Sequence, residues 1–252
     1  MHRFFVAPND GQRLADGAEI ALPTEEARHA AQVLRLTAGE SVELLDGESL
    51  YAGEMLHIEG QHASVRVLHR IEGREPRVHI TLYQALAKGE KMEGIIQKCT
   101  ELGVFAVQPL ALARCVQRMD EKRAQTAQAR WQRVAREAAK QCGRACVPQV
   151  FAPQTLAQLL PSMAATRPLI VPWEEARAGG LAEVLPTISQ KDGETPHIGL
   201  VIGPEGGITR EEIDTLLRIN GQTITLGPRI LRTETAGPAV IAAIMALTGG
   251  WA

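Results

Sequence analysis

The stretch HIGLVIGPEGGITREE, residues 197–212, decides the fold class of this chain. It places an apolar strand, a glycine-rich loop and the start of a helix in direct succession, and Thr209 and Glu212 have the spacing of a capping box. A loop at a helix amino terminus offers free backbone N–H groups to a ligand. The loop lacks the Gly-Lys-Ser/Thr of a P-loop and the GxGxxG of a dinucleotide site. Taken alone, it fits either a tight structural turn or a ligand-binding loop.

A second stretch, ITLGPRILRTETAGPAVIAAIMAL at 224–247, repeats this arrangement with a strand, a loop and an apolar helix that we expect to be buried. Arg232 and Glu234 stand just before that helix, where a carboxylate is favoured and an unpaired charge is costly. The pair could anchor the loop only, or it could serve a ligand. In open α/β sheets, ligands bind where loops converge at the carboxyl ends of the strands, and we expect both loops there.

The surrounding sequence predicts a mostly parallel sheet covered by helices, because strand and helix patterns alternate from about residue 78. The expected helices are 90–102 closed by Gly103, a basic helix, 209–220 closed by Gly221, and a last helix through Gly249. Residues 41–70 instead contain short strands broken by glycines. The boundary is expected within IEGREPR, residues 71–77, which gives domains at 1–73 and 74–252.

The composition excludes several classes of protein. Of 252 residues, 45% are apolar and 22% charged, with a formal net charge of -2, which indicates a folded globular chain rather than a disordered one. The four cysteines form no CxxC pair and have no histidine at ligand spacing, so we expect reduced thiols and no metal site. No signal peptide or membrane span is recognisable, and a cytoplasmic protein is expected.

The small net charge argues against a polyanionic partner until it is divided along the chain. Residues 81–150 contain 12 Lys and Arg against 6 Asp and Glu, whereas the segments before and after them are acidic. Within this block Arg133, Arg136, Lys140 and Arg144 follow helical spacing and share one stripe. The stripe is either a solvated helix face or a surface that binds a polyphosphate such as RNA.

Five motifs together carry a family resemblance: RFF and HAAQVLR near the start, KCTELGV at 98–104, REAAKQCGR at 136–144, GPEGG at 203–207 and LGPRILRTETA at 226–236. The chain resembles the RsmE-type ribosomal RNA methyltransferases of the SPOUT superfamily over nearly its whole length. The resemblance implies a SPOUT-type α/β domain with a deep trefoil knot, preceded by a small PUA-like β-barrel. It also implies a homodimer and S-adenosylmethionine-dependent methylation of N3 of a uridine in the 16S RNA of the small ribosomal subunit.

The resemblance, the chemistry of methyl transfer and the basic stripe together indicate which residues form the site. Arg232 is expected to stabilise charge that develops on the uracil carbonyls, and Glu234 to orient Arg232 or to help remove the N3 proton. The expected cofactor residues are Val171, Ile202, Gly203, Pro204, Glu205, Gly206, Leu226, Gly227, Ile230, Leu231, Thr235 and Ala236. The expected RNA-binding residues are Arg3, His29, Arg35, Arg114, Arg133, Arg136, Lys140 and Arg144, and for His29 the alternative is a hydrogen-bonded or surface histidine without an RNA contact.

Two other classes of function remain open on the sequence alone. A non-catalytic ribosome-assembly factor could use the amino-terminal domain and the basic helix without a cofactor. A nucleotide-binding phosphotransfer enzyme could use the GPEGG loop, although the chain shows no phosphate-binding lysine and no metal carboxylates at that loop.

Overall fold

The computed structural model describes residues 1–6, 14–47, 49–71, 75–116, 119–177, 179–185 and 195–251. The chain forms two compact units, an N-terminal unit of Met1–Glu75 with Ala139–Val147 and a C-terminal unit of Pro76–Ala138 with Pro148–Ala252. The expected boundary between residues 73 and 74 lies outside the described residues. The segment 139–147 packs with the N-terminal unit because Ala139 and Ala145 are buried against apolar side chains of its sheet.

The N-terminal unit is built on a mixed five-stranded sheet in the order β1-β3-β4-β5-β2. Its strands are β1 (His2–Phe5), β2 (Glu19–Ala21), β3 (Ser41–Leu45), β4 (Leu50–Glu59) and β5 (His62–Ile71). A short helix α1 (Thr24–Arg28) runs into the π-helical turn η2 (His29–Leu34). The strands alternate between buried and outward residues in β5, where Val65 and Val67 enter the core, as the sequence predicts.

The C-terminal unit contains a seven-stranded sheet in which every pairing is parallel. Its strand order is β12-β10-β11-β6-β7-β8, and β9 also pairs with β7. The bounds are β6 (His79–Ala85), β7 (Ala106–Ala111), β8 (Gln149–Val150), β9 (Gln154–Thr155), β10 (Leu169–Pro172), β11 (His197–Ile202) and β12 (Gly221–Ile224). The α/β class and the parallel sheet are therefore confirmed.

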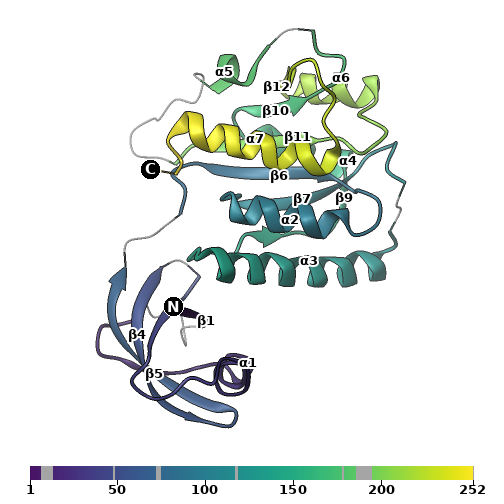
Figure 1. Ribbon diagram of the computed structural model, residues 1–252. Helices are drawn as coiled ribbons and strands as arrows, with labels where there is room; N and C mark the ends of the chain where they lie inside the picture. The colour runs from purple at the N-terminus through teal and green to yellow at the C-terminus, as the bar shows by residue number, and fades with distance from the viewer. Residues whose placement is uncertain are drawn as a thin grey trace. The chain divides into compact units, whose positions relative to one another are not determined.

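Helices cover both faces of this sheet (Figure 1). On one face lie α2 (Lys91–Glu101) and α7 (Thr233–Thr248), with α3 (Glu121–Cys142) beside the edge strand β8. On the other face, α4 (Leu156–Ala165) and α6 (Arg210–Arg218) contribute Leu159, Met163, Ile213 and Leu216 to the core. A single turn, α5 (Leu181–Val184), lies between β10 and β11 in the chain. The sheet core is therefore closed on two sides, as parallel strands require.

The helix ends show which local signals are reliable. The capping box is confirmed, since the Thr209 hydroxyl accepts from the Glu212 N–H at 3.3 Å and the Glu212 carboxylate accepts from the Thr209 N–H at 2.9 Å. The expected closure of α6 by Gly221 is wrong, because Asn220 takes the left-handed conformation with φ of 64°. Gly221 begins β12 instead, where a Cβ atom would lie 2.8 Å from the Leu216 carbonyl oxygen. Close approach, not left-handed backbone, requires this glycine.

Candidate functional site

A cavity of about 1050 Å³ lies at the carboxyl edge of the C-terminal sheet. Its walls are the residues that follow β10, the loop 203–209 after β11, the loop 225–232 after β12, and the first turn of α7. These loops meet because parallel strands end at the same edge. The expected site residues that line the cavity are Ile202, Gly203, Pro204, Glu205, Gly206, Leu226, Gly227, Ile230, Leu231, Arg232, Glu234 and Ala236.

Backbone geometry explains the glycines of these loops. Gly207 has φ of 74°, which side chains of other residues rarely allow, and it faces the Glu174 carboxylate, which would have to move to admit a Cβ atom. Gly203 has no room either, since a Cβ atom there would lie 2.7 Å from Cγ1 of Ile208. Gly227 has φ of 94° and faces open space, so its role is conformational. The loops therefore present backbone rather than side chains to the cavity at these positions.

Thr233 links the two loops, although no pattern in the sequence selects it. Its buried hydroxyl donates to the Gly203 carbonyl at 2.7 Å and accepts from the side-chain amide of Gln84 at 2.9 Å. The first residue of α7 is thus bonded both to the loop after β11 and to the strand β6. A hydroxyl so placed satisfies buried polar groups on two other elements.

Two expected cofactor residues do not line the cavity. Val171 is fully buried in β10 and packs in the sheet core with residues such as Trp173 and Val201. Thr235 is exposed in the first turn of α7, one residue away from the lining residues Glu234 and Ala236. Their assignment to the cofactor stays a prediction, and a role through neighbouring residues fits their positions.

Lys91, at the start of α2, is a residue of the cavity that sequence reasoning missed. Its ammonium lies 2.9 Å from Oε1 of Glu205 and 3.3 Å from Oε2 of Glu234. We call these three residues the Lys91 cluster. Each side chain is between a quarter and a third exposed, so the cluster is in contact with solvent. A lysine 114 residues from its nearer partner gives no signal in the local sequence.

The contacts of the Lys91 cluster change the acidity of its members. The hydrogen bond to Glu205 raises the pKa of Lys91. Burial acts to raise the pKa of Glu205, but the bonds from Lys91 and from the Lys88 N–H outweigh it and lower that pKa. The pKa of Glu234 is lowered by its own backbone N–H, against burial, and further by Lys91 and Arg232. Both carboxylates are therefore held as anions.

The guanidinium of Arg232 is exposed and lines the cavity. Within the described part of the chain it forms no hydrogen bond or ion pair, and Glu234 pairs with Lys91 instead. Glu234 is expected to orient Arg232, but among the described residues no hydrogen bond or ion pair joins these two side chains. The N–H donors of Arg232 have no acceptor among the described residues and are therefore available to a substrate.

Three of the expected RNA-binding residues form ion pairs with carboxylates of the N-terminal unit. Lys140 lies 2.6 Å from Glu26 and 3.4 Å from Nδ1 of His29, which is half-buried. The other two pairs join Arg144 to Glu75 at 2.7 Å and Arg3 to Glu43 at 2.6 Å, and Arg3 also donates to the carbonyls of Lys140 and Gln141. We call these three ion pairs the anchor pairs. They attach the segment 139–147 to the rest of its unit.

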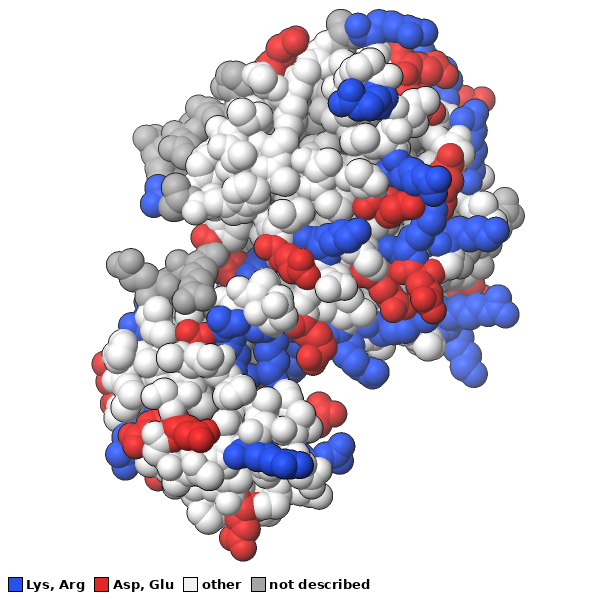
Figure 2. Space-filling model, viewed as in Figure 1, with Lys and Arg blue, Asp and Glu red and all other residues white. Residues whose placement is uncertain are grey.

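The remaining basic residues of the prediction are exposed. Arg133 and Arg136 lie on the outward face of α3, and Figure 2 shows Lys and Arg side chains gathered over α3 at the lower edge of the C-terminal unit. Arg35 is exposed with a left-handed φ of 54° in the N-terminal unit. Arg114 is exposed and donates to the Gly206 carbonyl at 2.9 Å, next to the cavity. These four residues keep the charge that an RNA contact needs.

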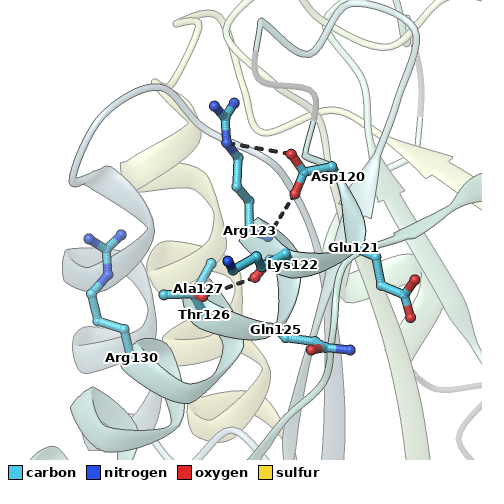
Figure 3. Close-up of a pocket in the computed structure, with 8 residues that line it drawn as sticks. All are labelled: Asp120, Glu121, Lys122, Arg123, Gln125, Thr126, Ala127 and Arg130. Carbon is cyan, nitrogen blue, oxygen red and sulfur yellow. Dashed lines mark hydrogen bonds and ion pairs between the residues drawn. The ribbon is translucent and has the colours of Figure 1, made fainter.

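A second, shallower depression of about 860 Å³ lies at the first turns of α3. Figure 3 shows that its charged side chains diverge from the helix instead of converging on one point. Asp120 caps the helix by accepting the Arg123 N–H at 2.8 Å and lies 3.6 Å from the Arg123 guanidinium. The lining carries both signs of charge without a shared focus, so it offers no binding chemistry comparable to that of the larger cavity.

Other classes of site are not found in the described ranges. No group of His, Cys, Asp and Glu that could hold a metal ion occurs among the described residues. No helix in the same part of the chain is long and apolar enough to cross a membrane. None of the four cysteines forms a disulfide, and burial raises the pKa of Cys99 and of Cys115.

Comparison with known proteins gives the family. A family model described as an RNA methyltransferase domain matches residues 74–245, and one described as an RNA methyltransferase PUA domain matches residues 22–68. The chain is 33% identical to ribosomal RNA small subunit methyltransferase E of Bacillus subtilis, over 97% of this chain and 96% of that one. The chain belongs to the ribosomal RNA small subunit methyltransferase E family.

Solved structures of similar proteins agree with this membership. The ribosomal RNA small subunit methyltransferase E of Neisseria gonorrhoeae, bound to S-adenosyl methionine, is 32% identical with a TM-score of 0.82, covering 98% of both chains. A methyltransferase of Legionella pneumophila in complex with the cofactor SAM is 29% identical with a TM-score of 0.82, covering 97% of both chains. As a member of the methyltransferase E family, the chain is an RNA methyltransferase with a PUA domain.

Proposed function

We propose that this protein transfers a methyl group from S-adenosylmethionine to N3 of a uridine in the 16S RNA of the small ribosomal subunit. The observation that carries the proposal is the cavity at the carboxyl edge of the parallel sheet, formed by two loops with Arg232 and Glu234 beside them. Relatives of 33% identity named ribosomal RNA small subunit methyltransferase E, and a similar structure bound to S-adenosyl methionine, support it.

The residues of the cavity fit this cofactor. Close backbone approach is possible at Gly203 and Gly207, which carry no side chain, so loop N–H and C=O groups are available to polar parts of the ligand. Ile202, Leu226 and Leu231 supply apolar surface for the adenine ring. We assign the binding of S-adenosylmethionine to these loops, with Thr233 fixing their separation.

Methyl transfer to N3 requires three actions from the chain: orientation of the uracil, removal of the N3 proton and stabilisation of charge on the carbonyl oxygens. S-adenosylmethionine, when bound, supplies an electrophilic methyl group on a sulfonium. Arg232 is exposed at the cavity, and its guanidinium has no partner among the described residues. We assign to Arg232 the stabilisation of the negative charge that develops on a uracil carbonyl oxygen. Its planar fork can donate two parallel hydrogen bonds and so also orients the ring.

Glu234 is held as an anion in the same cavity. A carboxylate with a lowered pKa is a weak base, so the structure favours a fixed negative charge that orients the uracil N3–H over full proton abstraction. In this role the carboxylate accepts a hydrogen bond from N3–H and increases electron density on the nitrogen. The N3 proton would pass to water, and the methyl group would come from the sulfonium, whose S–C bond breaks as N3 is methylated.

Binding of the RNA is assigned to the exposed basic residues. Arg114 contacts the loop that carries Gly206, which places a cation next to the cavity, and Arg133 and Arg136 extend positive charge along α3. Arg35 and His29 provide the corresponding contacts of the PUA domain, with Lys140 placed beside His29. The anchor-pair residues Arg3, Lys140 and Arg144 affect RNA binding mainly by stabilising the N-terminal unit that carries Arg35 and His29.

The proposal is tested on the purified protein and on small subunits from a strain that lacks it. Calorimetry should show one S-adenosylmethionine site per chain, and mass spectrometry should show one 3-methyluridine restored to 16S RNA when the protein and cofactor are added. RNA binding without cofactor binding would instead support the non-catalytic assembly factor. Loss of a different modified nucleotide from the deletion strain would contradict the assignment to N3 of uridine.

Finer features of the family belong to the same proposal. A trefoil knot in the C-terminal unit, closure of the five-stranded sheet as a PUA-like barrel, a cytoplasmic location and a homodimer follow from the resemblance. For the dimer, residues 241–247 offer only part of their apolar surface to a partner, because Ile241, Ile244 and Met245 are already buried within this chain. The outward residues Ala246 and Leu247 remain for a partner, and sedimentation of the purified protein measures the association.

A further inference from the structure

One ammonium group joins three elements at the cavity. Lys91 opens α2, Glu205 belongs to the loop after β11, and Glu234 lies in the first turn of α7. The Glu205 carboxylate oxygen that meets Lys91 at 2.9 Å also accepts the backbone N–H of Lys88 at 3.2 Å. The cation is thus shared by two carboxylates that come from separate elements of the cavity wall.

We propose that Lys91 is a positioning residue for methyl transfer: it holds the Glu234 carboxylate ionised and in place within the cavity, and it holds the cofactor loop through Glu205. This inference rests on the proposed function and adds a residue that acts through Glu234 without touching the uracil. Lys91 is therefore distinct in role from Arg232, which we place on the substrate itself.

Electrostatics explain why a cation is needed at this point. Two carboxylates that share one site repel each other, and without a cation one of them takes a proton or turns toward water. At 2.9 Å and 3.3 Å, Lys91 offsets that repulsion and also fixes the two side chains in space. Burial acts to raise the pKa of both glutamates, and Lys91 opposes it at each, together with the backbone N–H of Glu234 at that residue and the backbone N–H groups of Glu205 and Lys88 at Glu205.

A purely structural role for Lys91 makes a different prediction. Solvent-exposed ion pairs contribute little to the free energy of unfolding, so a cation that only supported α2 would leave protonation and catalysis unchanged. The charged groups that act on Glu234 are Lys91 from α2 and Arg232 from the preceding loop. Glu205 is the other carboxylate that Lys91 contacts. Other charged residues of the same cavity are Glu174, Arg177 and Arg229.

The test compares Lys91→Met with Lys91→Arg and with the control Lys98→Met, which changes an exposed lysine on the same helix. We expect Lys91→Met to lower kcat about 10- to 100-fold, as misplacement of a group near the reacting atoms does. The acid limb of its kcat–pH profile should move to higher pH, because loss of the cation raises the pKa of Glu234. The KM for RNA should change little, Lys91→Arg should recover most of the rate, and Lys98→Met should match the wild type.

A second readout needs no activity. In cofactor-free protein, carbon NMR of the glutamate carboxyl groups, assigned with Glu234→Gln and Glu205→Gln, follows their titration directly. Lys91→Met should raise the pKa of Glu234, and an unchanged titration together with an unchanged kcat–pH profile would overturn the role of Lys91. A wild-type protein that titrates as expected but methylates no RNA would contradict the proposed function while leaving the Lys91 contact established.

Discussion

The Lys91 cluster and the anchor pairs both consist of charged side chains in close contact, yet they differ in balance and burial. Among the described residues, each cation of the anchor pairs faces a single carboxylate, and the side chains of Lys140, Glu26 and Arg144 are 14%, 9% and 7% exposed. In the Lys91 cluster one cation serves two carboxylates at about one third exposure. A cation with one carboxylate is neutral as a pair. The Lys91 cluster, with one cation and two carboxylates, keeps one net negative charge at the cavity. Arg232 lines the same cavity and has no ion pair within the described ranges.

From this difference we expect the anchor pairs to act on stability and the cavity residues to act on chemistry. The sharpest test of the first half is Arg144→Met. Removing one member of a largely buried pair should reduce the free energy of unfolding of the N-terminal unit by about 3 kcal/mol, measured by urea denaturation. The double variant Arg144→Met with Glu75→Gln should recover part of this loss, because no uncompensated charge remains. Unchanged stability with weakened RNA binding would instead make Arg144 an RNA contact.

The second half of the comparison is tested by Arg232→Lys. The lysine keeps the charge but loses the planar fork, so single-turnover methylation with saturating RNA should slow about 100-fold. Urea denaturation should show a free energy of unfolding within about 0.5 kcal/mol of the wild type, since the guanidinium has no protein partner in the described residues. A wild-type rate would remove Arg232 from the chemistry and reduce it to a loop residue.

Thr233→Val tests a residue that we expect to contribute both to stability and to cofactor binding. The variant leaves the Gly203 carbonyl and the Gln84 amide without their buried partner, which should reduce stability by about 1–3 kcal/mol. Calorimetry should also show weaker binding of S-adenosylmethionine, because the loop after β11 loses its tether. Thr233→Ser keeps the hydroxyl and is the matched control. Equal cofactor affinity in all three proteins would limit Thr233 to a structural role.

The smallest effect is expected at the exposed basic residues of α3. Arg133→Ala with Arg136→Ala should flatten the dependence of log affinity on log salt, by about 0.9 for each phosphate that is no longer neutralised. Arg218→Ala, an exposed arginine at the end of α6, is the control and should keep the wild-type slope. A double variant with the wild-type slope would show that this part of α3 is a solvated face.

In both regions the sequence predicts the local features and misses the contacts between distant residues. The capping box of Thr209 and Glu212, the parallel sheet and the cavity loops depend on residues close together in the chain, so their patterns are visible locally. The contacts of Lys140 with Glu26 and of Lys91 with Glu205 each span 114 residues and leave no local pattern. Helical spacing placed Arg133, Arg136, Lys140 and Arg144 on one stripe, but it could not show that acidic residues from another part of the chain neutralise the last two.

The bonds of Thr233 have a consequence for how the cofactor enters and leaves. Because this hydroxyl bonds the Gly203 carbonyl to the start of α7 and to β6, the wall of the cavity after β11 cannot swing open without breaking buried hydrogen bonds. The opposite wall, the loop 225–232, has Gly227 in a left-handed conformation and Ile230 with 86% of its surface exposed. Exchange of spent for fresh cofactor should therefore proceed by movement of that loop, and its rate should depend on substitutions at Gly227 more than on those at Gly203.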